Sequence, residues 1–382
     1  MLKNSHLKLK KFITCYFYAF EFLLIPSTRC SAINKGRLAI IPLLLCLSIF
    51  STSYHLFFKM KSVDNVIELV YSINFTFGGI QTLITTISLN MFSKNDLFQT
   101  LKYFDDIVNS DDELMRKARQ KELKRSLTIA WKLVRSFLLI ITAGCIPLTL
   151  PGLLQTIFTP MYYTIPGIPS DNIFYGSVNI IGTIALFFLL VECTISMDCL
   201  FMTYLFYFHG EIYSINSVAK LLNNREILTT QCDKVLRTIY KAHRKALKQF
   251  SFLYNVTWHF YFQKFFGALM YLCTGLFIFS RINNSIIFGI IIQTFALSQL
   301  LFLCIPGQLL KNCSESLRET LYMSLWYELD IKNKRKLIII MNGVHRGIHA
   351  ETFGIGRISI FTFVQICKMA VSYTAFAYAV IL

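Results

Sequence analysis

The residue types that perform most protein chemistry are scattered along this sequence. Only His345 and His349 stand at a spacing with chemical meaning, because residues four apart on a helix share a face and two imidazoles there can hold a metal ion. Two ligands alone make a weak site, and Gly347 between them is more typical of a loop or a helix end. The eleven Cys form no CxxC pair. The sequence therefore predicts no catalytic residue, no metal site, no cofactor and no enzyme.

Three of the ionisable residues inside long apolar runs are candidates for function, because a charge there is costly. They are Glu68, Glu192 and Lys368. For Glu192 the more ordinary alternative is a buried hydrogen bond to a neighbouring Ser or Thr. What any of the three does depends on how the apolar runs are arranged.

The composition is that of a membrane protein. Of the 382 residues 54% are hydrophobic and 15% are charged, and the mean hydropathy is +0.52. Soluble domains carry about 25% charged residues, so a water-soluble enzyme is disfavoured. The net charge of +17 suits either nucleic acid or anionic lipid. Because a nucleic-acid-binding protein has no need of 35 Phe, we expect membrane lipid and no nucleic acid as a partner.

Seven apolar runs reach the length of about 20 residues that a helix needs to cross a bilayer. The sequence therefore predicts an all-α membrane protein with seven transmembrane helices. A shorter aromatic run, Phe12–Ile25, is predicted to lie in the membrane interface as a helix. The seven predicted spans are Leu38–Phe58, Val63–Phe92, Leu127–Leu150, Tyr175–Phe208, His259–Ser280, Ser285–Leu310 and Ile358–Leu382.

Lys and Arg predict the orientation of these spans. Thirty of them fall in alternate stretches of the chain, and only Lys59, Lys61 and Arg281 fall in the others. By the positive-inside rule the N-terminus is cytoplasmic and the C-terminus is extracellular. This order is the inverse of that in G-protein-coupled receptors. The four basic stretches are 1–37, 94–125, 220–248 and 311–346.

Asp111–Arg125 carries acidic residues first and basic residues after them, which suits the dipole of a helix. Gln231–Phe250 and Ser314–Asn342 interleave apolar and basic residues, with the apolar ones at helical spacing. We expect long cytoplasmic extensions of helices 4–7 that pack into an anchor domain and onto another subunit; the alternative is a basic face that binds anionic lipid. The outer stretch 151–174 has four Pro and is predicted to be an ordered cap. The predicted regions are a cytoplasmic segment with the interfacial helix (1–37), transmembrane helices 1–4 (38–230), helices 5–6 with the anchor (231–356) and the seventh helix (357–382).

About the last 150 residues carry a recognisable pattern. Gly307 lies near the end of the sixth span, and Ser316, Leu317 and Tyr322 are followed by Trp326–Tyr327 and the basic-apolar run Lys334–Met341. The last helix adds Thr362–Phe363, Lys368 and Ser372–Tyr373, and Asp198 and His243 also match. This pattern resembles the insect odorant receptors. The related gustatory receptors end with Thr-Tyr followed by Gln-Phe, which this chain lacks.

The resemblance implies the odorant-binding subunit of a ligand-gated, non-selective cation channel. Such a subunit forms a hetero-tetramer with the co-receptor Orco in the plasma membrane of an olfactory neuron, in its dendrite. The resemblance implies that residues 38–230 are the ligand-binding part and that the seventh helix (357–382) lines the pore through which cations pass. It also implies a small, volatile, apolar ligand. A gustatory receptor channel and, less favoured, a secondary transporter with a midplane site are the alternatives; no repeat between the two halves supports the transporter.

Helical spacing together with the resemblance selects candidate residues, for which plain helix packing is the ordinary alternative. A lysine in a cation pathway is tolerable only where the conduit is wide or the amine reaches the cytoplasmic vestibule. The gate candidates, on one face of the last helix, are Lys368, Ser372, Phe376, Ala379 and Val380. The pocket candidates are Tyr71, Asn74, Phe75, Thr142, Cys145, Thr149, Val178, Ile181, Ala185, Phe288, Ile292 and Phe295.

Overall fold

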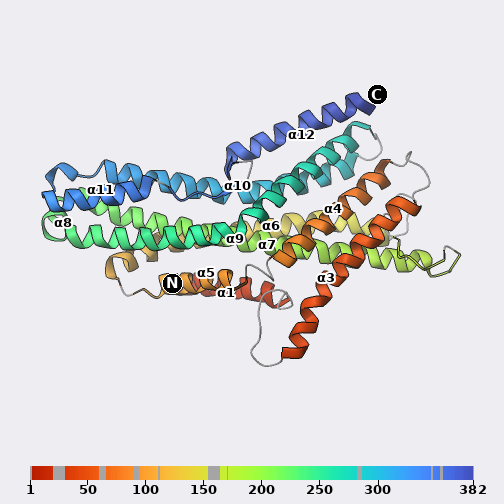
Figure 1. Ribbon diagram of the computed structural model, residues 1–382, viewed down its shortest axis with the longest axis horizontal. Helices are drawn as coiled ribbons and strands as arrows, with labels where there is room; N and C mark the ends of the chain where they lie inside the picture. The colour runs from red at the N-terminus through yellow and green to blue at the C-terminus, as the bar shows by residue number, and fades with distance from the viewer. Residues whose placement is uncertain are drawn as a thin grey trace.

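A computed structural model of the chain describes residues 2–19, 31–59, 66–88, 94–110, 112–153, 164–169, 171–281, 286–345, 347–352 and 356–381. The described residues form mainly helices (Figure 1). One short antiparallel hairpin lies between the last two helices. The helices are α1 (Leu2–Ala19), α3 (Ser31–Tyr54), α4 (Val66–Ser88), α5 (Lys94–Val108), α6 (Glu113–Leu153), α7 (Tyr175–Ala219), α8 (Arg225–Thr230), α9 (Cys232–Arg281), α10 (Ile286–Tyr322), α11 (Ile331–His345) and α12 (Ile360–Ile381). The hairpin strands are β1 (Glu351–Thr352) and β2 (Gly356–Arg357).

Each predicted span coincides with one described helix. The spans fall, in order, on α3, α4, α6, α7, α9, α10 and α12. Within the described residues, three stretches are long and apolar enough by composition to cross a membrane: Tyr175–Asn223, Ile292–Tyr322 and Ile360–Ala379. The all-helical class that the sequence predicts is confirmed.

Four long helices give the molecule its shape. In Figure 1, α6, α7, α9 and α10 run along most of the longest axis, while α3, α4 and α12 lie toward one end and α8 and α11 lie at the other. We call the end with α3, α4 and α12 the apolar half. The basic half is α1, α5, α8 and α11 with the adjoining parts of the long helices, and it holds most of the stretches that the sequence predicts to be cytoplasmic.

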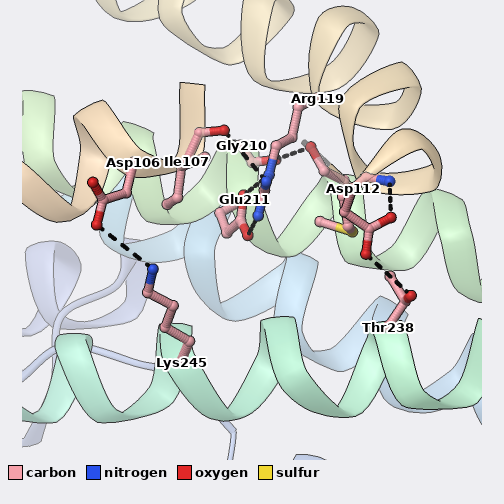
Figure 2. Close-up of polar contacts among 10 residues, drawn as sticks. Asp106, Ile107, Asp112, Arg119, Gly210, Glu211, Thr238 and Lys245 are labelled. Atoms are coloured by element: carbon pink, nitrogen blue, oxygen red, sulfur yellow. Dashed lines mark hydrogen bonds and ion pairs between the residues drawn. The ribbon is translucent and has the colours of Figure 1, made fainter. Parts of the chain in front are cut away.

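A buried ion pair joins α6 to α7 in the basic half (Figure 2). The guanidinium of Arg119 donates to both carboxylate oxygens of Glu211 at 2.8 and 2.5 Å, and its third nitrogen donates to the carbonyl of Ile107 at 3.3 Å. The two side chains are only 9% and 1% exposed. The helices approach closely beside this pair, since a Cβ at Gly210 would lie 2.7 Å from a Leu123 methyl carbon. The pair therefore fixes α5, α6 and α7 as one unit.

The first turns of α1 belong to this unit as well. His6 binds the Tyr207 hydroxyl of α7 at 2.7 Å through Nδ1 and Asp105 of α5 at 2.8 Å through Nε2. Leu2 and Leu9, one turn away on either side, are buried. The predicted interfacial helix Phe12–Ile25 lies outside the residues whose side chains are described.

The helix that the sequence predicts over Ser314–Asn342 is interrupted. α10 ends at Tyr322, and the buried Ser324 hydroxyl donates to the carbonyl of Leu321 at 2.7 Å, which satisfies an acceptor that the helix end leaves open. α11 then begins at Ile331 and packs against α9, where Lys336 and Asp233 form an ion pair. α11 ends at His345, and Gly347 has a φ of +64°, so His345 and His349 do not share a helix face. Among the described residues no group of three metal-ligating side chains exists.

We expect the basic half to lose stability in mild acid through His243 of α9. This side chain is 5% exposed, and burial lowers its pKa from 6.5 to about 4. Between these values the unfolded chain binds a proton that the folded chain does not, so the contribution is intact above pH 6.5 and is lost as the pH falls toward 4. Thermal unfolding of the purified chain across this range should show the loss. It should shrink in His243→Gln and persist in His345→Gln, which changes an exposed histidine; equal curves for both variants would contradict the assignment.

Candidate functional site

An aromatic layer lies in the apolar half, on the seam where α4, α7, α9 and α10 meet. The amide of Asn74 donates to the hydroxyl of Thr274 at 3.0 Å, which joins α4 to α9. On the next residue of α4, the Phe75 ring lies 5.6 Å from the ring of Phe187 of α7. An apolar wall with a single amide and hydroxyl suits an apolar ligand that has one hydrogen-bonding group.

Tyr271 of α9 completes the layer. Its ring meets the Phe295 ring of α10 edge-on at 6.5 Å, and its hydroxyl points at α4, where a Cβ on Gly78 would lie only 2.5 Å from it. Glycine at position 78 therefore leaves room for the tyrosine hydroxyl. Sequence reasoning selected faces on α4, α6, α7 and α10 and missed this face of α9, although Tyr271 and Thr274 stand three residues apart as neighbours on one helix face do.

A polar cavity lies on the same seam, closer to the basic half. It is small, with a volume of about 10 Å³, roughly the space of one water molecule, and it is lined by side chains of α4, α7 and α9. Lys264 of α9 lines it, and its Nζ lies 2.9 Å from Oδ1 of Asp198 of α7; the two side chains are 6% and 3% exposed. The aromatic layer thus has a polar floor that contains a buried ion pair. The other lining residues are Gln81, Thr82, Thr85, Thr86, Cys193, Thr194 and Met197.

The predicted pocket residues divide into three groups. Asn74, Phe75 and Phe295 belong to the aromatic layer, and Ile292 is buried one turn from Phe295. Val178 is half-buried, whereas Ile181 and Ala185 are exposed on α7 and are not brought to the layer. The side chains of Tyr71, Thr142, Cys145, Thr149 and Phe288 lie outside the described residues.

The intramembrane charges that the sequence singles out are not in this layer. Glu192 is exposed on α7 and Lys368 is exposed on α12, while the side chain of Glu68 is outside the described residues. The buried charges of the seam are instead Asp198, which the sequence pattern selected, and Lys264, whose partner no spacing rule could supply because the two stand 66 positions apart.

The expected cap over the outer side is described only in part. The hydroxyl of Thr164 and Nδ1 of His55, at the end of the first predicted span, lie 2.7 Å apart and both residues are buried. The amide of Ile165 donates to Asn179 of α7 at 2.9 Å. These contacts tie residues 164–165 to two helices; residues 154–163 are outside the description.

α12 packs on the bundle along one narrow stripe. Ile366 and Ala370 are buried against α9 and α10, and Thr374 continues the stripe by donating to the carbonyl of Cys273 at 3.4 Å. The predicted gate residues Lys368, Ser372, Phe376 and Ala379 are exposed and lie on the opposite side of the helix, and Phe376 is 69% exposed. The side chain of Val380 is outside the described residues. A single subunit therefore leaves this face uncovered.

Comparison with known proteins agrees with this architecture. The model of the 7tm odorant receptor family matches residues 63–371. No curated protein matches the chain. Two solved structures of the insect olfactory receptor OR5 from Machilis hrabei have the same fold: the complex with eugenol has a TM-score of 0.76 and the structure without it 0.77, each at 12% identity. The alignments cover 98% of this chain and 100% and 99% of the two matched chains.

The family match spans most of the chain, and the structural match spans nearly all of it. Members of this family are multi-pass membrane proteins that act as ligand-gated channels in olfaction, and they are not enzymes. The chain therefore belongs to the insect odorant receptor family.

Proposed function

We propose that the chain is the odorant-binding subunit of a non-selective cation channel that it forms together with the co-receptor Orco in the plasma membrane of an olfactory neuron. One observation carries the proposal. Tyr271 and Thr274 of α9 face the aromatic layer, while Cys273 between them contacts α12. One turn of α9 thus touches both the candidate ligand site and the candidate pore helix.

Two hydrogen bonds to backbone carbonyls join α9 to α12. The Cys273 thiol donates to the carbonyl of Ala370 at 3.6 Å, and the Thr374 hydroxyl donates to the carbonyl of Cys273 at 3.4 Å. A ligand that displaces Tyr271 or Thr274 moves this turn of α9. The two hydrogen bonds between Cys273 and α12 then move with it. In this proposal the ligand acts by preferring the arrangement in which α12 has shifted.

The proposed ligand is small and mostly apolar with one polar group, because the layer offers several rings, one amide and two hydroxyls. The OR5 structure from Machilis hrabei that binds eugenol is a relative by fold. The proposed site comprises Asn74, Phe75, Tyr271, Thr274 and Phe295.

The proposed pore needs several subunits, since one helix cannot enclose a conduit. The uncovered face of α12 supports this, because four of its side chains, from Lys368 to Ala379, have no covering element among the described residues. Current recordings from cells that express this chain with and without Orco, against a panel of volatile compounds, test the proposal. Current that appears only with Orco is the expected result. Current from this chain alone, evoked by sugars or bitter compounds, would point to a gustatory channel instead.

We expect Phe75→Ala to reduce ligand potency and to leave conductance and ion selectivity unchanged. Phe75 is half-buried, and loss of its aromatic contact with the ligand should cost on the order of 1–3 kcal/mol, or about tenfold to a hundredfold in affinity. Dose–response curves in cells that express the variant with Orco measure the effect. Ile181→Ala is the matched control, because Ile181 is 66% exposed and lies on the helix that also carries Phe187. If Ile181→Ala shifts potency and Phe75→Ala does not, the ligand site lies on another face of α7.

A further inference from the structure

A second cavity lies in the basic half, where α10, the end of α11 and the β1–β2 hairpin meet. Its volume is about 230 Å³. Lys311 and Arg318 line it from α10, His345 and His349 from the segment that ends α11, and Arg357 from β2. It is separate from the seam of α4, α7 and α9 and takes no part in the proposed odorant site.

The charge of this cavity is positive. Three permanent cations, Lys311, Arg318 and Arg357, face one carboxylate, Glu315, which lies 3.9 Å from the Lys311 amine. The neighbouring Glu351 is occupied by two partners, since His349 lies 2.8 Å from its carboxylate and Arg357 lies 3.4 Å from it. The cations thus outnumber the carboxylates, and they come from two separate segments of the chain.

The cavity stands at the point where α12 begins. Arg357 precedes the first residue of α12 by three positions. About one turn before Lys311, α10 touches the same segment: a Cβ at Gly307 would lie 2.5 Å from the carbonyl oxygen of Ile358, and Gln308 accepts a hydrogen bond from the amide of Ile360 at 3.3 Å. In the predicted orientation this junction lies at the cytoplasmic end of the last span, at the depth of the lipid headgroups.

We propose that this cavity binds a phosphate-bearing anion of the inositol phosphate type. Guanidinium groups match phosphate oxygens as a fork and lysine adds a point charge, so cations on α10 and β2 can hold one multivalent anion between them. A headgroup of the cytoplasmic leaflet and a soluble inositol polyphosphate share this chemistry. Basic sites beside the cytoplasmic ends of membrane helices attract such lipids.

Binding to the purified full-length chain in nanodiscs of phosphatidylcholine tests the proposal without any odorant or channel activity. The probes are short-chain phosphatidylinositol bisphosphate and inositol trisphosphate. We expect at least one of them to bind saturably, and Lys311→Gln or Arg318→Gln to weaken its binding about tenfold each, as expected for a lost charge-assisted hydrogen bond. If the lipid binds more tightly than inositol trisphosphate, the anion comes from the membrane. If the two affinities are equal, the anion is a soluble ligand.

Lys332→Gln is the matched control. It removes the same charge from an exposed position on α11 that does not line the cavity. Thermal unfolding of all three variants shows whether each is folded; Arg318 is exposed, so its replacement should not alter stability. Absence of binding by both probes, or equal weakening by Lys332→Gln and Arg318→Gln, would overturn the proposal, because the attraction would then be a property of the general surface charge.

The site would also have a consequence for gating, which rests on the proposed channel function. An anion held between Lys311 and Arg357 ties α10 to the residues that lead into α12. In excised patches we expect the lipid to change the current evoked by a fixed odorant dose, and Arg318→Gln to reduce that change. Unaltered gating with normal binding would leave the binding site in place and remove only its coupling to α12.

Discussion

Replacement of Glu211 by Gln should lower the free energy of unfolding of the chain by about 3–5 kcal/mol, because it leaves the Arg119 charge buried without its counter-charge. The carboxylate accepts two hydrogen bonds from this guanidinium and is only 1% exposed, so water cannot take its place. Thermal unfolding of the purified chain and the amount of protein at the cell surface both measure the loss. We expect most of the variant to be retained inside the cell.

Two further variants test whether the loss of stability comes from the burial of the ion pair or from the loss of a charge alone. Glu328→Gln breaks the exposed ion pair with Arg225, whose side chain is 77% exposed, and should cost no more than about 1 kcal/mol. The double variant Arg119→Met with Glu211→Met should regain much of the stability, since an apolar pair avoids the desolvation of two charges. Equal losses from Glu211→Gln and Glu328→Gln would show that the buried pair does not hold the basic half together.

Replacement of Phe376 by Asn should give a leak current without ligand when the chain is expressed with Orco. In the proposed channel this ring faces the conduit, and a hydrophobic constriction stops ions because water leaves the narrow apolar stretch. An amide in its place holds water and lets ions pass. The leak should be partial, because each of the other subunits supplies its own gate residues. Whole-cell current before any odorant is applied, normalised to surface protein, measures it.

Val371→Asn is the control for this effect. Val371 is 59% exposed, much like Phe376 at 69%, but it lies about 140° away around α12. The two substitutions therefore add the same polar group to equally accessible positions on different faces. A leak from Val371→Asn together with an unchanged current from Phe376→Asn would place the pore on the side of α12 that carries Val371.

The spans were predictable because each depends on its own stretch of sequence. A helix in a bilayer satisfies its backbone internally, so hydropathy alone marks it, and the seven predicted runs fall on seven described helices. No helix was predicted over α5, which lies in the basic stretch 94–125, although Leu97, Leu101, Phe104 and Val108 stand at helical spacing and three of them are buried. The break after Tyr322 was missed because the apolar spacing continues on both sides of it.

Contacts between distant segments were not predictable in this way. Arg119 and Glu211 stand 92 positions apart, and nothing in either neighbourhood indicates the other. The same holds for the rotation of each helix about its axis, which decides that Phe187 enters the aromatic layer while Ile181 stays exposed. Periodicity shows which residues share a face, but the packing of the neighbouring helices selects the face that turns inward.

α9 is a single helix of 50 residues, so it is about 75 Å long. It reaches the ion pair of Asp233 with Lys336 near one end and the turn that touches α12 near the other. Such a rod acts as a lever: a tilt of about 3° around its middle displaces each tip by about 2 Å, which is the scale of the helix shifts that switch packed interfaces. The buried Lys264–Asp198 contact lies about 11 Å from the middle of α9, so the same tilt about this contact would move Asp233 by about 2.4 Å and the turn at Cys273 by about 0.7 Å. A small rocking motion about that point would thus move the two halves of the receptor in opposite directions.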